Sequence, residues 1–254
     1  MQRLLLTLRY DGSRYHGWQV QKNGITVQET LQDAVERLTG IRSGITGCSR
    51  TDAGVHAEMY CCAFDTDFPL RGERMAKALN AHLPRDIAVY GCREVGMDFH
   101  PRYAALGKRY VYRIWNAPER NPFWEGRAFH CRRPLDVAFL TDQAAAYVGT
   151  HDFLSHQAAG STVEGTVRTV RRAGVEQQGD LVLFTVEADG FLYNMVRIMV
   201  GTLLEIQAGR LEAGSIPAIL ESRSRDRAGA TAPACGLYLD CVFYPFDKQH
   251  TDGG

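Results

Sequence analysis

The chain has 254 residues, and its 29 Lys and Arg residues are balanced by 29 Asp and Glu residues, so the formal net charge is zero. The hydrophobic share of 45% and the charged share of 23% are typical of a soluble globular protein. These values exclude a disordered tail protein, a collagen-like fibre and a protein that binds nucleic acid through a general cationic excess. They remain compatible with a local basic surface.

The first half of the chain predicts alternating strands and helices. Leu4, Leu6 and Leu8 share one face of a strand at 4–9. Thr26 and Glu29 form a capping box for a helix that Gly40 ends. The other elements expected here are strands at 58–64, 87–95 and 109–115, a helix at 73–83 that Pro84 ends, and a long polar and aromatic loop at 11–24.

The second half repeats this order and predicts a second α+β unit. Its expected elements are helices at 136–148, 192–208 and 215–222 and strands at 165–176, 181–188 and 237–244, with a hairpin turn at Gln178-Gly179-Asp180. Each half then reads as strand–helix–strand–strand–helix–strand, which predicts two similar ferredoxin-like or RRM-like halves with antiparallel sheets. Prolines between 116 and 134 indicate the boundary. We expect an N-terminal half at 1–117, a C-terminal half at 118–247 and a frayed tail at 248–254.

The compartment and the metal content follow from short patterns. The sequence has seven cysteines, an odd number, and no Cys-x-x-Cys pattern. Both observations argue against a disulfide framework and a zinc site. The N-terminal apolar run is too short for a secretory signal, and the longest apolar stretch, 192–206, contains charged residues that exclude a membrane span. We expect a cytoplasmic protein without a bound metal ion.

The segment from Gly47 to His56 has the highest density of chemically active residues. It contains Arg50 and Asp52 and directly precedes an expected strand. Functional residues concentrate in loops held by a rigid sheet. An Asp-x-Gly sequence is more often only a turn, so this segment by itself leaves both interpretations open.

Arg197 lies in a predicted helix that is apolar nearly all round, and we therefore expect it to be buried. A buried guanidinium requires a carboxylate partner, although a structural ion pair or a side chain that reaches solvent remain alternatives. Asp52 is a candidate partner. Such a pair would keep the carboxylate ionised, as a nucleophile requires.

A basic stretch runs from residue 99 to residue 135. It contains eight Lys or Arg residues and two acids, a net charge of 8 − 2 = +6. Aromatic residues interleave with the bases, as on surfaces that stack unpaired nucleotides. Strand alternation places Tyr110 and Tyr112 on one face. A solvated basic edge is the alternative interpretation of this stretch. The polar and aromatic loop at 11–24 also has two interpretations: it contacts RNA, or it is a packed loop.

Together these segments resemble the tRNA pseudouridine synthase A family over nearly the whole chain. The segments that carry the resemblance are Tyr10-Asp11-Gly12 to Trp18-Gln19, Thr26-Val27-Gln28 to Leu31, 50–56 (Arg-Thr-Asp-Ala-Gly-Val-His), 80–84, 99–102, 108–110, 149–153, 166–169 and 191–197. The Arg-Thr-Asp-x-Gly-Val-His string is specific in that context. Three residues depart from the family pattern: Pro101 replaces the usual Ala, His156 replaces an aromatic Phe, and Cys48 occupies a small-residue position.

The resemblance implies that uridine is isomerised to pseudouridine at positions 38, 39 and 40 of the tRNA anticodon stem-loop. Asp52 matches the catalytic aspartate, which acts as nucleophile or as base. Tyr110 matches the tyrosine that stacks on the target base and Arg197 the arginine that pairs with the aspartate. Arg50 matches a residue that takes the place of the flipped base. The further expected substrate contacts are Lys108, Arg109, Arg102 and His56.

The resemblance also implies a homodimer with a tRNA in a central RNA-binding cleft, and neither a cofactor nor a catalytic metal. Two other functions remain open, a non-catalytic RNA chaperone and a related enzyme that acts on another RNA. An acid at the centre of an RNA site opposes phosphate binding and therefore favours catalysis over the chaperone. A metal-dependent hydrolase is disfavoured because no clustered carboxylates or His ligands accompany Asp52.

Overall fold

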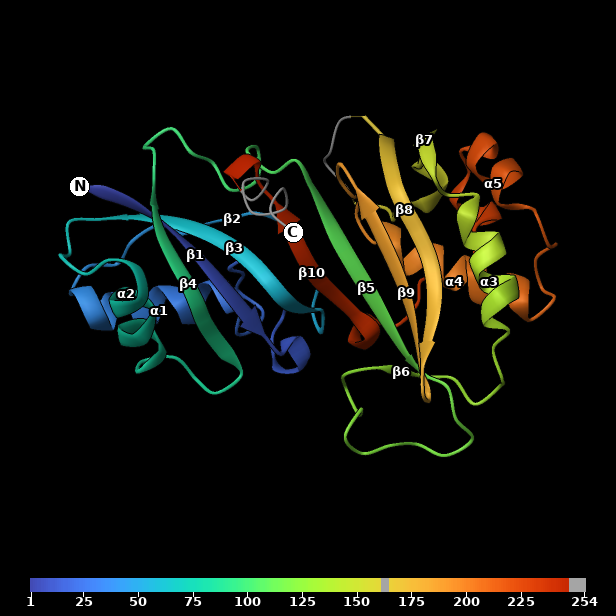
Figure 1. The fold of residues 1–254 in the computed structure, drawn as a ribbon, viewed down its shortest axis with the longest axis horizontal. Helices are drawn as coiled ribbons and strands as arrows, with labels where there is room; N and C mark the ends of the chain where they lie inside the picture. The colour runs from blue at the N-terminus through green and yellow to red at the C-terminus, as the bar shows by residue number, and fades with distance from the viewer. Residues whose placement is uncertain (161–164, 247–254) are drawn as a thin grey trace, which may run out of the picture. The chain divides into compact units, whose positions relative to one another are not determined.

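The computed structural model describes residues 1–160 and 165–246. Its contacts divide the chain into two compact units: unit 1 contains residues 1–106 and the C-terminal segment from Tyr238, and unit 2 contains residues 107–237. Each unit combines strands and helices (Figure 1), which confirms the mixed α+β class. The division places the strand at 107–115 in unit 2, whereas the sequence-based boundary at 117 assigns it to the first half. The expected tail at 248–254 lies outside the described residues.

The sheet of unit 1 has the strand order β4 (Ile87–Val95), β1 (Gln2–Tyr10), β3 (His56–Thr66) and β10 (Leu237–Phe243). β1 pairs antiparallel with both β3 and β4, and β10 pairs parallel with β3. A two-residue strand, β2 (Thr46–Gly47), also pairs with β3. Leu4, Leu6 and Leu8 are fully buried, as their alternation predicts.

The helices of unit 1 are α1 (Val27–Thr39) and α2 (Gly72–Asn80). Thr26 accepts a hydrogen bond from the Glu29 N–H, and Gly40 ends α1 in the left-handed conformation with φ +78°, as predicted. The prediction that the second helix extends to residue 83 is wrong. The Asn80 side-chain amide exchanges two hydrogen bonds of 2.7 and 2.8 Å with the Val89 backbone, and a turn follows it.

The sheet of unit 2 has the strand order β5 (Gly107–Trp115), β9 (Leu181–Ala188), β8 (Val167–Gln178) and β7 (Gly149–Asp152). All of these neighbours are antiparallel, and a two-residue strand, β6 (Phe129–His130), adds to β5 in parallel. The hairpin between β8 and β9 is confirmed, and Gly179 in its turn has φ +60°.

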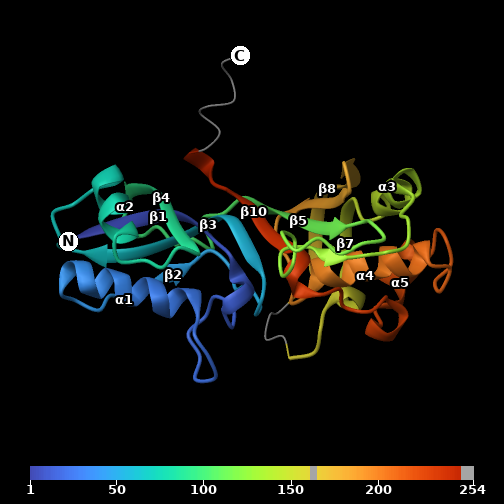
Figure 2. The ribbon, with the colours of Figure 1, turned by 90° about the horizontal axis from the view of Figure 1, so that it is seen from below.

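The helices of unit 2 are α3 (Val137–Ala145), α4 (Met195–Gln207) and α5 (Ile216–Ser222). α4 lies along one face of the unit 2 sheet (Figure 2). The helix begins three residues later than predicted because Asn194 has φ +60°, which breaks the helical path. No helix in the described ranges is long and apolar enough to cross a membrane.

His156, which departs from the Phe expected from the resemblance, is fully buried in unit 2. Its Nε2 lies 3.1 Å from the Tyr147 hydroxyl and its Nδ1 lies 3.0 Å from the Ser155 hydroxyl. Burial lowers the pKa of this imidazole to about 3, because the charged form would lose its hydration. The core of unit 2 therefore contains a neutral, hydrogen-bonded histidine.

This burial predicts a specific loss of stability in acid. Below about pH 6.5 the unfolded chain binds a proton at His156 that the folded chain does not, and the free energy of unfolding falls by about 1.4 kcal/mol per pH unit until the pH approaches 3. His156→Phe removes this contribution. Denaturant titrations of both proteins at several pH values should diverge below pH 6.5 and run parallel above pH 7.5. Curves that stay parallel down to pH 4.5 would contradict the prediction.

Candidate active site

Asp52 lies in the loop that connects β2 to β3. The Val55 N–H donates to the Asp52 carbonyl at 3.1 Å, and Gly54 has φ +77°, a conformation that favours glycine. The turn interpretation of Asp-x-Gly is therefore correct for the backbone. The Asp52 side chain is half-buried on this turn, so the turn also holds a carboxylate in a restricted environment.

The loop that follows β1, which includes a short 3₁₀ turn at Gly12–Arg14, packs against the Asp52 turn. The Trp18 N–H donates to the Thr51 carbonyl at 3.1 Å, and the Gly54 N–H donates to the Tyr15 carbonyl at 3.2 Å. These two hydrogen bonds flank Asp52 in the sequence. They fix the backbone before and after the carboxylate, and they show that the 11–24 loop is packed at this point.

Two glycines allow this close approach. A Cβ on Gly12 would overlap the Val55 carbonyl oxygen and lie 2.6 Å from its carbon, and a Cβ on Gly17 would overlap the Thr51 carbonyl oxygen. Gly17 also has φ +84°. Neither role was predicted from the sequence, although the five-residue spacing of Gly12 and Gly17 within an aromatic loop was a visible signal.

A buried aromatic pair packs near the loop that carries Asp52. The rings of Trp18 and Tyr60 stack with their centroids 4.0 Å apart, and the Tyr60 hydroxyl donates to the Ser49 carbonyl. The Tyr10 hydroxyl forms a 2.8 Å hydrogen bond with the Thr51 hydroxyl. Aromatic side chains from β1 and β3 thus stiffen the loop that carries Asp52.

His56 is only 1% exposed at the start of β3. Its Nδ1 accepts a 3.0 Å hydrogen bond from the Gly12 N–H and lies 3.3 Å from a carboxylate oxygen of Asp11. The ring stacks on Tyr238 at a centroid distance of 4.5 Å. This imidazole therefore joins the two loops rather than presenting a ring face to solvent.

Arg50 and Arg102 are both exposed in unit 1. Arg50 is two residues before Asp52 on the same loop. Arg102 follows His100, whose Nδ1 accepts a 3.2 Å hydrogen bond from the Arg102 N–H and whose ring lies 4.3 Å from that of the exposed Tyr103. Both arginines can reach an anionic ligand without loss of packing.

Lys108, Arg109 and Tyr110 are consecutive on β5 in unit 2. Tyr110 is 6% exposed, and its ring meets the ring of Phe191 edge-on at a centroid distance of 4.9 Å. Tyr112 is also buried, as the predicted shared face requires. The two cations are half-buried.

Arg197 is in the first turn of α4 and is half-buried rather than buried, which corrects the expectation from the apolar helix. Its Nε donates to the Ala232 carbonyl at 2.7 Å, and its Nη1 donates to the Asn194 side-chain oxygen at 2.8 Å. Both acceptors are neutral oxygen atoms. Neither acceptor was predicted, because the sequence indicated either a carboxylate partner or a side chain that reaches solvent.

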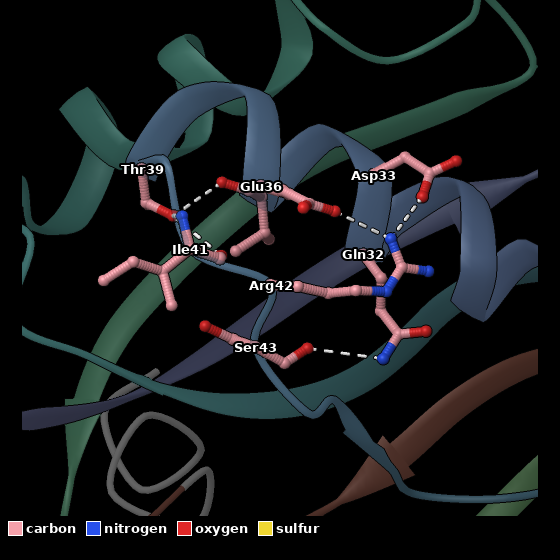
Figure 3. Close-up of polar contacts among 8 residues, drawn as sticks. Gln32, Asp33, Glu36, Thr39, Ile41, Arg42 and Ser43 are labelled. Atoms are coloured by element: carbon pink, nitrogen blue, oxygen red, sulfur yellow. Dashed lines mark hydrogen bonds and ion pairs between the residues drawn. The ribbon is translucent and has the colours of Figure 1, made fainter.

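Acidic residues of unit 1 gather on the outward side of α1, where Arg42 compensates part of their charge. Arg42 lies 2.7 Å from Asp33 and 2.8 Å from Glu36 in the close-up of Figure 3. The Gln32 amide donates to the Ser43 carbonyl beside them at 3.3 Å. Arg42 therefore compensates part of the negative charge of Asp33 and Glu36.

The structure places Arg50 and Asp52 on one loop of unit 1, directly before His56 at the start of β3, and Lys108, Arg109 and Tyr110 on one strand of unit 2. Arg102 lies elsewhere in unit 1, and Arg197 lies on α4 of unit 2. Among the described residues, no group of three or more His, Cys, Asp or Glu side chains could hold a metal ion.

Comparison with known proteins identifies the family. A family model described as tRNA pseudouridine synthase matches residues 7–104 and 143–245. A protein of Moorella thermoacetica named tRNA pseudouridine synthase A is 49% identical over 243 residues, covering 95% of this chain and 99% of the relative. A protein of Acetivibrio thermocellus with the same name is 46% identical over 244 residues, covering 96% of this chain and all of the relative.

A solved structure described as a Cbf5-Nop10-Gar1 complex aligns with 96% of this chain and 60% of its own chain, at 11% identity. Its TM-score of 0.37 is too low to support a conclusion about the fold. The family model and the curated relatives are sufficient on their own. The chain belongs to the tRNA pseudouridine synthase family, whose members are isomerases that act on tRNA.

Proposed function

We propose that this protein converts uridine to pseudouridine at positions 38, 39 and 40 in the anticodon stem-loop of tRNAs. Family membership across nearly the whole chain supports the reaction class. The observation that carries the proposal further is the Asp52 carboxylate, half-buried on a loop that flanking hydrogen bonds hold. Such rigidity suits a group that must meet one atom of a substrate with precise geometry.

The proposed reaction begins when the target nucleotide leaves the helical stack, because its sugar cannot be reached within a paired stem. Ionised Asp52 then either attacks C1′ of the ribose or removes a proton from C2′ to give a glycal. Either route breaks the bond between C1′ and N1. The freed uracil rotates and rejoins C1′ through C5. This step displaces the Asp52 carboxylate from C1′ in the first route, and in the second route it is accompanied by return of the proton from Asp52 to C2′. Loss of the C5 proton and protonation of N1 complete the isomerisation.

The remaining residues receive supporting roles in this proposal. Tyr110 stacks on the uracil, keeps it from diffusing away, and accepts or relays the C5 proton. Arg197 pairs with Asp52 and keeps it ionised. Arg50 fills the space that the flipped base leaves in the stack.

The roles of the other expected substrate contacts follow from how exposed each side chain is. Arg102, Lys108 and Arg109 bind phosphate groups, since each is exposed or half-buried. His56 supports the Asp52 loop from within and contributes to RNA binding through that loop, because its own ring is buried.

The larger assembly is part of the same proposal. Two similar ferredoxin-like or RRM-like halves, with their antiparallel sheets, form a central RNA-binding cleft, and two chains form a homodimer across which a tRNA lies. The enzyme works in the cytoplasm and uses neither a cofactor nor a catalytic metal.

The direct test is to map pseudouridine in a tRNA transcript with uridine at position 39 after incubation with the protein. A matched transcript without uridine at 38–40 is the control. Pseudouridine in the first transcript alone supports the proposal. Modification at other positions would indicate a related enzyme with another target, and binding without modification would indicate an RNA chaperone.

The charge distribution predicts tRNA binding that weakens with salt. All eight basic residues between 99 and 135 are exposed or half-buried, although the chain as a whole is neutral. Arg102→Gln should reduce the slope of log K against log salt concentration by about 0.7–0.9, the value for one lost phosphate contact. Affinity is measured by filter binding at five salt concentrations.

Arg42→Gln provides the matched control for this experiment. Arg42 is also a surface arginine of unit 1, but Asp33 and Glu36 already pair with it. Its slope should equal that of the wild type. Equal slopes for all three proteins would remove Arg102 from the proposed phosphate contacts.

A further inference from the structure

Residues 229–236 of unit 2, which we call the strap, lie against the residues that surround Arg197. Arg197 exchanges two hydrogen bonds with the strap: its Nε donates to the Ala232 carbonyl at 2.7 Å, and its own carbonyl accepts from the Ala232 N–H at 3.1 Å. One strap residue thus holds both the side chain and the backbone of Arg197.

The strap approaches α4 over two further helical turns. Gly201 is four residues after Arg197 and so lies on the same helix face. A Cβ at Gly201 would overlap the Ala230 carbonyl oxygen. The Gly229 N–H donates to the Thr202 hydroxyl at 2.9 Å, and the Ala230 N–H donates to a carboxylate oxygen of Glu205 at 3.1 Å.

The opposite side of the strap is fastened to β5. The Tyr112 hydroxyl donates to the Pro233 carbonyl at 2.8 Å, and a Cβ on Gly236 would lie only 2.6 Å from Cζ of the same ring. Tyr112 is fully buried and shares the inner face of β5 with Tyr110. The strap therefore connects the strand that carries Tyr110 with the helix that carries Arg197.

A third support comes from the start of α4. Asn194 has φ +60°, and its side-chain oxygen accepts from Arg197 Nη1 at 2.8 Å. Non-glycine residues rarely adopt this conformation, which asparagine tolerates better than most. The guanidinium is consequently held at two of its nitrogens by two neutral acceptors from different segments.

We propose that Tyr112, acting through the strap, and Asn194 are positioning residues for Arg197. This inference rests on the proposed function, in which Arg197 pairs with Asp52. An arginine side chain has many rotamers, and acceptors fixed in advance restrict it to the one that suits its partner. Neutral acceptors do this without neutralising the charge, so the guanidinium keeps its capacity to stabilise a carboxylate.

The first test is Tyr112→Phe, which deletes only the hydroxyl that fastens the strap. The expected result is a kcat about three- to tenfold lower, the size of one hydrogen bond, with the KM for tRNA unchanged. Tyr147→Phe is the matched control. It removes another buried tyrosine hydroxyl of unit 2, which contacts His156 and the Met199 carbonyl of α4 but not the strap, and it should leave kcat unchanged.

A double-mutant cycle with Arg197→Lys distinguishes positioning from a separate effect. If Tyr112 acts through the arginine, Tyr112→Phe should not lower kcat further in the Arg197→Lys background. Equal fold-changes in both backgrounds would overturn the inference. Full activity of Arg197→Lys alone would instead count against the role of Arg197 in the proposed function, so the two failures are distinguishable.

Asn194→Gly provides an independent variant if Tyr112→Phe does not fold. Glycine retains the positive φ without strain and deletes the acceptor. The same loss of kcat at constant KM is expected in the wild-type background. In the Arg197→Lys background, Asn194→Gly should not lower kcat further. Thermal melts of each variant set an assay temperature at which all are folded. Wild-type kcat in Asn194→Gly would overturn the inference for this residue.

Discussion

Asp52→Asn should abolish pseudouridine formation and leave tRNA binding intact. The amide has nearly the shape of the carboxylate but can serve neither as nucleophile nor as general base. A general base alone contributes about 10²- to 10⁴-fold to a rate, so the loss should be at least of this size. Pseudouridine is mapped in U39-containing tRNA after a long incubation, and tRNA affinity is measured on the same preparation.

Asp67→Asn is the matched control for this variant. Asp67 is an exposed acid of unit 1 whose carboxylate lies 2.6 Å from the N-terminal ammonium, and the same substitution there should leave turnover unchanged. Appreciable turnover by Asp52→Asn would refute the assignment. Loss of tRNA affinity together with activity, at an unchanged melting temperature, would assign Asp52 to binding instead of chemistry.

The sequence predicted the elements whose side chains repeat with a clear period. Leu4, Leu6 and Leu8 identified β1, and the cap at Thr26 with the stop at Gly40 gave both ends of α1. The two-residue strands β2 and β6 have too few residues to show any period and were missed. Such strands exist only because a longer neighbour supplies their hydrogen bonds, which no local pattern reveals.

Both errors at helix ends occur at an asparagine whose conformation or tertiary contact the local sequence does not reveal. Apolar periodicity extended α4 back to Leu192, but the left-handed conformation of Asn194 overrides it. Asparagine adopts that conformation at modest cost, and the sequence does not show that it does so here. Likewise, Asn80 ends α2 by pairing with Val89, a contact nine residues away on a strand.

In the candidate site, the residue types could be recognised from the sequence, but their contacts could not. The Asp52 loop was recognisable because its residues are unsuited to a core, and Arg197 because a charge interrupts an apolar helix. However, the sequence predicted for Arg197 either a carboxylate partner or a side chain that reaches solvent. Its neutral acceptors, Asn194 and the Ala232 carbonyl, were not foreseen, since one is a backbone atom that residue identity does not encode.

Gly17→Ala should lower both stability and turnover. Gly40→Ala is the control that separates the cost of a side chain at positive φ from the cost of a steric overlap. Both glycines belong to unit 1 and have similar dihedral angles, φ +84° and φ +78°. A Cβ at Gly40 meets nothing within 4 Å, whereas a Cβ at Gly17 would overlap the Thr51 carbonyl oxygen. The two variants therefore share the cost of a side chain at positive φ, and only Gly17→Ala adds a steric conflict beside Asp52.

The shared conformational cost is about 1–2 kcal/mol of unfolding free energy. The overlap at Gly17 should add about 1–3 kcal/mol, the usual range for excess volume in a packed region. Relief of the overlap requires movement of the Thr51 backbone, and a displacement of about 1 Å can reduce a rate by about 10²-fold. Denaturant titration and kcat for both variants check this. Equal kcat values in the two variants would show that the Asp52 loop does not depend on its contact with Gly17.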